Sequence, residues 1–160
     1  MFLQGICTER YYWIVFAFSQ ANQGLMVHAW VLMTNHMHMI CSRRPGNDIA
    51  LVLRNIKSFT ALKLIHAIIK NPNESRRENM LNLFEAEGKK SSSNFRFKFC
   101  EHGNHPILLD SILTYNQRLN YLHCNPVTTG FVTEPWHWKL SSATDYFSKE
   151  MGLLDLILLE

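Results

Sequence analysis

Hydrophobic and polar residues recur along the chain with two different periods, which predict helices in some segments and strands in others. In "IALVLRNIKSFTALKLIHAIIK" (residues 49–70) apolar residues recur every three or four positions, which predicts a long helix capped by Asp48. Further helices are predicted over residues 75–87, 111–125 and 141–147. We expect Gly88 to end the first of these and Pro126 to end the second.

Three segments have the composition or the alternation of strands. "LMVHAWVLM" and "HMHMICS" (25–33 and 36–42) are separated by the turn chemistry of Thr34-Asn35, so they form a hairpin or one bent ribbon. "NFRFKFC" (94–100) places phenylalanine on one face and basic residues on the other. Strands interleaved with helices predict an α+β domain, with an antiparallel sheet and helices packed on one of its faces.

The composition is that of a globular protein. The 160 residues are 47% hydrophobic and 18% charged, which predicts one domain spanning 1–160. No apolar run reaches the roughly 18–20 residues of a membrane span, so we expect no membrane association. The cysteines, at positions 7, 41, 100 and 124, form no CxxC pair. This pattern favours buried free thiols in a reducing compartment and predicts a cytoplasmic protein.

Basic residues are concentrated in the middle of the chain. Residues 43–98 hold twelve Lys or Arg and five Asp or Glu. Because the net charge of the whole chain is only +3, the remaining residues carry an excess of negative charge. Two interpretations stay open at this point, a localised contact with a polyanion and ordinary solvated helix faces.

Two pairs of residues could carry chemistry. His36 and His38 lie two apart in an apolar strand, so both imidazoles project from one face while Met37 and Met39 face the core. Such a pair is costly to bury unless it binds something, which indicates a metal or phosphate site. Tyr121 and Asn125 lie four apart and share a helix face. They could be a nucleophile and an oxygen ligand suited to Mg²⁺ or Mn²⁺, or else a core residue and a helix C-cap.

Several motifs carry a family resemblance that runs from about Thr8 to the end of the chain. "HMH" is a His-hydrophobic-His triplet, and "YLHCNPVTTGFV" follows it at the expected spacing. With "FKFCEHGNHP" and "WHWKLSSATDY", they make the chain resemble the REP-associated tyrosine transposases and their HUH single-tyrosine insertion-sequence relatives. The resemblance implies a transposase-like enzyme with a ferredoxin-like sheet that acts as a homodimer.

The resemblance also implies a site, residue by residue. His36 and His38 would be metal ligands for Mg²⁺ or Mn²⁺, and Asn125 would be the third, polar ligand. Tyr121 would attack a DNA phosphodiester and leave a 5′-phosphotyrosyl link and a free 3′-hydroxyl. The implied substrate is single-stranded DNA near hairpins. Its phosphates would meet basic residues of the central zone, for which we name Arg43, Arg44, Arg54, Lys57 and Lys63.

The chain departs from the family pattern at two places. Thr34 stands where the family usually has proline, a small change in turn stiffness. Residues 8–22 have the aromatic content of a strand, but Thr8 and Gly24 could cap a helix, and alignment with the family favours the helix. The first strand of the family then has no counterpart, which predicts an exposed sheet edge that a dimer could cover.

Two other functions compete with the enzyme. One is a non-catalytic remnant or domesticated domain that binds single-stranded nucleic acid through its basic zone. The other is a structural metal site in which His123 or His102 joins the histidine pair. The second explains nothing about "YLHCNPV", so we expect the enzyme first and the binding module next.

Overall fold

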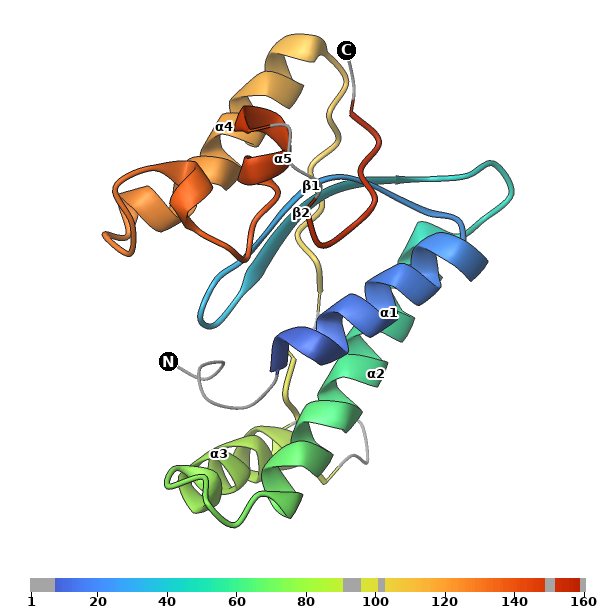
Figure 1. Cartoon of the computed structure of the whole chain (residues 1–160). Coiled ribbons are helices and arrows are strands. Elements are labelled where there is room, and N and C mark those ends of the chain that lie inside the picture. The colour runs from blue at the N-terminus through green and yellow to red at the C-terminus, as the bar shows by residue number, and fades with distance from the viewer. Residues whose placement is uncertain (1–7, 91–95, 101–102, 149–151, 159–160) are drawn as a thin grey trace.

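The computed structural model describes residues 8–90, 96–100, 103–148 and 152–158 (Figure 1). In this part of the chain the fold is α+β, with two antiparallel strands and five α-helices. The elements in order are α1 (Thr8–Asn22), β1 (Leu25–Leu32), β2 (Met37–Arg43), α2 (Ile49–Lys70), α3 (Arg77–Lys89), α4 (Ile112–Thr128), the 3-10 helix η1 (Pro135–His137) and α5 (Ala143–Phe147). The predicted hairpin and the helices expected over 8–22 and 49–70 are confirmed.

Strand β1 lies between β2 and the C-terminal part of the chain. Its other edge is covered by residues 140–142, because Leu32 N–H donates to the Leu140 carbonyl and Ser142 N–H donates to the Trp30 carbonyl. In the ladder Trp30 and Leu32 stand opposite Met39 and Met37 of β2. In an antiparallel pair the backbone N–H and C=O groups of successive residues point alternately toward and away from the partner strand. Those of Met37 and Met39 point away from β1. No described residue donates or accepts a backbone hydrogen bond at that outer edge of β2.

A β-bulge at His28 changes which side chains of β1 face which side of the hairpin. The pairing skips from Val27 to Ala29, so one extra residue shifts the alternation of side chains. Leu25 and Val27 before the bulge and Trp30 after it face the same core cluster. The two ring nitrogens of His28 bond to the Ile157 carbonyl and to Ser42 Oγ, both at 2.7 Å, which ties the bulge to β2.

Helices cover both faces of the hairpin, and the expectation of helices on one face is therefore wrong (Figure 1). Val27 and Trp30 pack with α1 and α2 on one side. Ala29 and Val31 pack with Tyr115 of α4 on the other side. The physical reason is that β1 is buried on both faces, whereas the prediction treated the strands as having one polar face.

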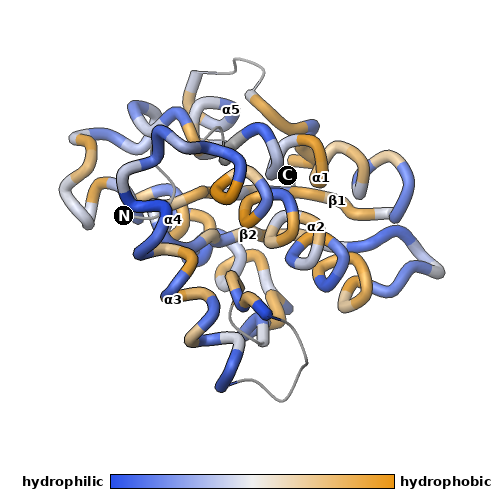
Figure 2. The backbone as a smooth tube through the Cα atoms, turned by 90° about the horizontal axis from the view of Figure 1, so that it is seen from below, coloured by the Kyte–Doolittle hydropathy of each residue, from blue (hydrophilic) through white to orange (hydrophobic). Residues whose placement is uncertain are grey.

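Helix α2 is the long helix that the apolar periodicity predicts. Asp48 caps it by accepting hydrogen bonds from Ala50 N and Leu51 N. Its buried residues recur every four positions and form one stripe, namely Val52, Ile56, Thr60, Leu64 and Ile68. Figure 2 shows the same alternation of hydrophobic and hydrophilic positions along the helices.

The strand predicted over residues 94–100 is not formed. Residues 96–100 have no strand partner, and residues 94–95 lie outside the described part of the chain. Phe97 and Phe99 instead pack with Phe84 against α2 and α3, and Lys98 N–H donates to the Phe84 carbonyl in the middle of α3. The alternating phenylalanine side chains therefore pack on a helix surface and do not form one face of a strand.

Two predicted helix ends are also wrong. Helix α3 continues through Gly88 to Lys89, and α4 continues through Pro126 to Thr128. Gly88 is buried, so its small size suits close packing. Pro126 removes one helix hydrogen bond, but its carbonyl accepts from Phe131 N–H, so the last turn is held from outside.

None of the helices in the described residues is long and apolar enough to cross a membrane. Cys41, Cys100 and Cys124 are free thiols, as expected, but they are half-buried and not fully buried. Cys7 lies outside the described residues.

Candidate functional site

The alternation of β2 separates its methionines from its histidines. Met37 and Met39 pack toward the cluster formed by β1, α1 and α2, as the sequence predicts. His38 therefore projects from the opposite face, toward α4, and His36 stands just before the first residue of the strand. The two imidazole rings lie with centroids 4.9 Å apart and planes at 78°. The hairpin thus brings the predicted histidine pair together.

Helix α4 brings the phenol of Tyr121 to this histidine pair. The Tyr121 ring lies 5.6 Å from the His38 ring, centroid to centroid, with an edge-on angle of 71°. The residue is 54% exposed. Tyr115 and Leu122 form the buried face of α4. Tyr121 lies at the border of that face because it precedes Leu122 by one residue, a 100° step around the helix.

His123 anchors α4 and takes no part in the site. It is 3% exposed, and its Nε2 lies 2.9 Å from Ser142 Oγ. Ser142 Oγ also accepts a hydrogen bond from Trp30 N–H and donates its own hydrogen to the Trp30 carbonyl. In the contact with His123, Ser142 Oγ is therefore the acceptor and Nε2–H is the donor. Burial lowers the pKa of His123 to about 4. His123 does not group with the histidine pair, since no three His, Cys, Asp or Glu side chains of the described residues lie together as metal ligands. His102 lies outside the described residues.

The histidine pair has the chemical form of metal ligands. His36 Nδ1 donates a hydrogen bond to Asn35 Oδ1 at 2.7 Å, which leaves the lone pair on Nε2. Burial, and second the nearby His36, lower the pKa of His38 below its usual value. A lowered pKa keeps the His38 ring neutral near pH 7, and a neutral ring is the form that binds a metal ion.

The remaining predicted ligand, Asn125, lies one helical turn after Tyr121 and is half-buried. No group of three His, Cys, Asp or Glu among the described residues could hold a metal ion. Of the residues predicted from the sequence, the Asn125 amide oxygen would be the third protein ligand of a divalent ion at the histidine pair. Two imidazoles and one amide oxygen fit Mn²⁺ well and Mg²⁺ less well, because Mg²⁺ prefers oxygen ligands. This donor set is electrically neutral, so the anionic ligands would come from substrate phosphates.

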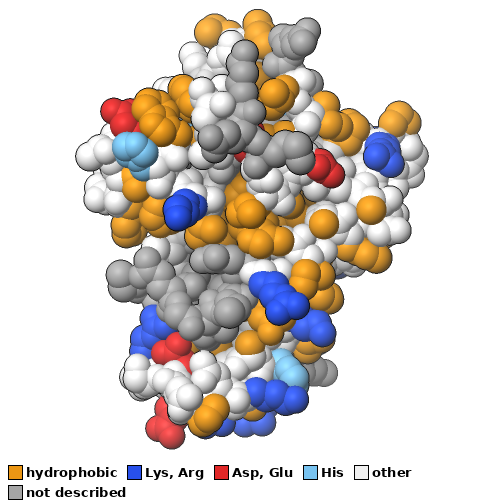
Figure 3. Space-filling model, in the orientation of Figure 1, with side chains coloured by type: hydrophobic (Ala, Val, Ile, Leu, Met, Phe, Trp, Pro, Cys, Tyr) orange, Lys and Arg blue, Asp and Glu red, His pale blue; other side chains and the backbone are white. Residues whose placement is uncertain are grey.

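The basic residues predicted to bind DNA are not gathered at the histidine pair. Arg43 ends β2, five residues and therefore about 16 Å along the strand from His38, and Arg44 lies beyond it. Arg54, Lys57 and Lys63 lie on α2, which packs on the other face of the hairpin. Arg43 and Arg44 therefore lie at the other end of β2 from His38, because an extended strand carries neighbours in sequence far apart. Figure 3 shows Lys and Arg side chains gathered over the half of this view that holds α2 and α3.

Two of these basic residues have contacts of their own. Lys57 Nζ donates to the Gly103 carbonyl, which connects α2 to the segment after the described residues 96–100. Lys63 Nζ stands over the Phe59 ring at 5.5 Å from its centroid, a cation–π contact on the same helix.

Arg118 is a basic residue near the site that is not among the DNA-binding residues predicted from the sequence. Arg118 is exposed and precedes Tyr121 by three residues and Asn125 by seven on α4. Positions i, i+3 and i+7 share one helix face, so Arg118 lies on the same stripe as Tyr121 and Asn125. The helical spacing in the sequence was the signal that could have identified it.

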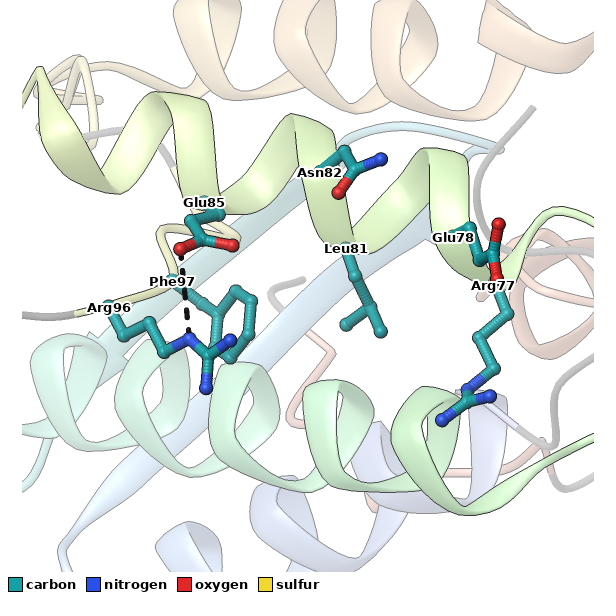
Figure 4. Close-up of a pocket in the computed structure, with 7 residues that line it drawn as sticks. All are labelled: Arg77, Glu78, Leu81, Asn82, Glu85, Arg96 and Phe97. Atoms are coloured by element: carbon teal, nitrogen blue, oxygen red, sulfur yellow. Dashed lines mark ion pairs between the residues drawn. The ribbon is translucent and has the colours of Figure 1, made fainter.

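A groove beside α3 is a separate feature. Its lining residues are Arg77, Glu78, Leu81, Asn82, Glu85, Arg96 and Phe97 (Figure 4). The two arginines stand at opposite ends, and Arg96 Nε lies 3.8 Å from Glu85 Oε1. Two cations and two carboxylates leave the groove with balanced charge, and no residue of the histidine–tyrosine site lines it.

Comparison with known proteins yields no relative. No protein-family model matches the chain, and neither a curated protein nor a solved structure matches it. Inferences about function therefore rest on the residues and their geometry.

Proposed function

We propose that the chain is a cytoplasmic, metal-dependent DNA-nicking and strand-transfer enzyme of the tyrosine transposase type. The observation that carries the proposal is the meeting of Tyr121 with His38, with ring centroids 5.6 Å apart and the tyrosine 54% exposed. The two residues are 83 positions apart in sequence and come from different elements. A nucleophile and a metal ligand on facing elements form the minimum of such a site.

In the proposed reaction the hydroxyl oxygen of Tyr121 attacks the phosphorus of a DNA phosphodiester. The P–O3′ bond breaks, a 5′-phosphotyrosine bond forms, and the phenol proton ends on the released 3′-hydroxyl. One phosphodiester replaces another, so the reverse attack by a 3′-hydroxyl can reseal DNA on a new end. Mg²⁺ or Mn²⁺ held by His36, His38 and Asn125 would polarise the phosphate and offset charge in the transition state.

The proposed substrate is single-stranded DNA next to hairpins. Arg118 lies on the Tyr121 face of α4 and would bind a phosphate beside the scissile one. Arg43, Arg44, Arg54, Lys57 and Lys63 would meet DNA outside the site, since they lie at the far end of the hairpin or on its other face. DNA that reaches them must extend well beyond the cleaved bond.

We further propose that the chain has a ferredoxin-like fold and that it forms a homodimer. A two-stranded hairpin with helices is compatible with that fold. Among the described residues the outward backbone groups of Met37 and Met39 have no hydrogen-bond partner, which supports the pairing of a further strand there.

The test is a covalent-adduct assay with labelled single-stranded DNA that carries a hairpin, in the presence of Mn²⁺. The wild-type protein should give an adduct that survives SDS, and Tyr121→Phe should give none while still binding the DNA. Tyr11→Phe is the matched control, because Tyr11 belongs to α1 on the other face of the hairpin. An adduct of undiminished yield in Tyr121→Phe would refute the proposed nucleophile. DNA binding without an adduct in the wild type would favour the non-catalytic binding module.

A further inference from the structure

Asn35 is a residue of the hairpin turn to which the proposed reaction gives no role. It is exposed and lies directly before His36. The turn that holds it is closed by a backbone hydrogen bond of 2.8 Å from Met33 N–H to the His36 carbonyl. The Asn35 side chain also contacts His36, because Asn35 Oδ1 lies 2.7 Å from His36 Nδ1. The turn therefore holds Asn35 in hydrogen-bonding contact with His36, one member of the histidine pair.

This contact decides where the proton of the His36 ring resides. An amide oxygen can only accept a hydrogen bond, so Nδ1 must carry the hydrogen. In a neutral imidazole the other nitrogen, Nε2, then holds a free lone pair. Without the acceptor, the ring can also place its hydrogen on Nε2, and that tautomer cannot offer the outer nitrogen to a metal ion.

We propose that Asn35 is a positioning residue that holds His36 in the tautomer and ring orientation needed for metal binding through Nε2. The inference rests on the proposed function, because it assigns His36 to a metal ion. Outer hydrogen-bond partners of ligating histidines fix tautomer and direction in this way in metal sites generally. Asn35 would act only through His36.

The first measurement reads the tautomer directly and needs neither metal nor DNA. Two-dimensional ¹H–¹⁵N NMR of protein labelled in histidine, with His36→Gln to assign the signals, shows which ring nitrogen carries hydrogen. In the wild type the His36 hydrogen should reside on Nδ1. In Asn35→Ala the signal should move toward the Nε2–H form, and Asn35→Asp, which keeps an acceptor oxygen, should restore Nδ1–H.

The second measurement is Mn²⁺ affinity by titration calorimetry of the same proteins. Asn35→Ala should weaken Mn²⁺ binding by about 10–100-fold, the usual effect of losing such a partner, and Asn35→Asp should recover most of it. Asn82→Ala is the matched control, because Asn82 is an exposed asparagine on α3. An unchanged tautomer, or unchanged Mn²⁺ affinity in Asn35→Ala, overturns the role of Asn35 alone. Absence of Mn²⁺ binding in the wild type overturns the proposed metal site and this inference with it.

Discussion

Acidification should unfold this protein through His123, the buried histidine that joins α4 to β1. Burial lowers its pKa from 6.5 to about 4, so the folded protein holds the ring neutral where the unfolded chain would protonate it. Above pH 6.5 both states are neutral and the full stability is present. Between about pH 6.5 and 4 only the unfolded chain takes up the proton, so stability falls as the pH falls. At about 1.4 kcal/mol per pH unit, the loss reaches about 3 kcal/mol, a large part of a small domain's stability.

The assay is urea unfolding followed by tryptophan fluorescence at several pH values from about 7 to about 4. Trp30 is fully buried beside His123's partner Ser142 and reports the transition. The variant His123→Gln keeps a side-chain N–H for Ser142 but cannot titrate, so its stability should fall less steeply with pH than that of the wild type. His66→Gln, an exposed position on α2, is the control. Parallel pH dependence of the wild type and His123→Gln would refute the assigned cause.

Two further predictions concern DNA and metal. Arg118→Ala should weaken binding of a short single-stranded oligonucleotide, measured by fluorescence anisotropy, and should reduce the salt slope of the affinity by about one. Arg54→Ala should change neither the affinity nor the slope. An equal effect of the two variants would contradict the placement of Arg118 beside Tyr121. Because two imidazoles and an amide leave the ion's charge uncompensated, DNA should raise Mn²⁺ affinity, and Mn²⁺ should raise DNA affinity by the same factor. Calorimetric titration of Mn²⁺ with and without the oligonucleotide measures this, and equal affinities would refute it.

Local rules predict most of the elements in this chain because their causes are local. The four-residue spacing of apolar side chains and the Asp48 cap are both contained within the sequence of α2, and the structure has this helix with the predicted bounds. The hairpin turn at Thr34-Asn35 likewise lies between two segments that pair with each other. The alternation of β2 is enough to place His38 and Met39 on opposite faces.

Predictions that depend on a distant partner fail. The alternating phenylalanines of 94–100 look the same whether their partner is a strand or a helix surface, and here Phe97 and Phe99 meet α3. The two-sided burial of β1 depends on α4, which follows some eighty residues later. Arg43 is close to His38 in sequence, but the extended strand places the two residues at opposite ends of β2. The stripe that adds Arg118 to Tyr121, by contrast, follows from helical spacing alone.

The geometry of the candidate site depends on residues that never touch it. Strand β1 is the common support, since it holds β2 through the ladder and through the contact of His28 with Ser42. It holds α4 through the bond from His123 to Ser142, which is bonded to Trp30. Because His38 and Tyr121 are each fixed to β1 by separate connections, loosening either connection would change the distance between them without removing a reacting group. Loss of the Ser142 hydroxyl should therefore reduce strand cleavage and weaken metal binding, because it misplaces both Tyr121 and the proposed third ligand Asn125, which belong to α4.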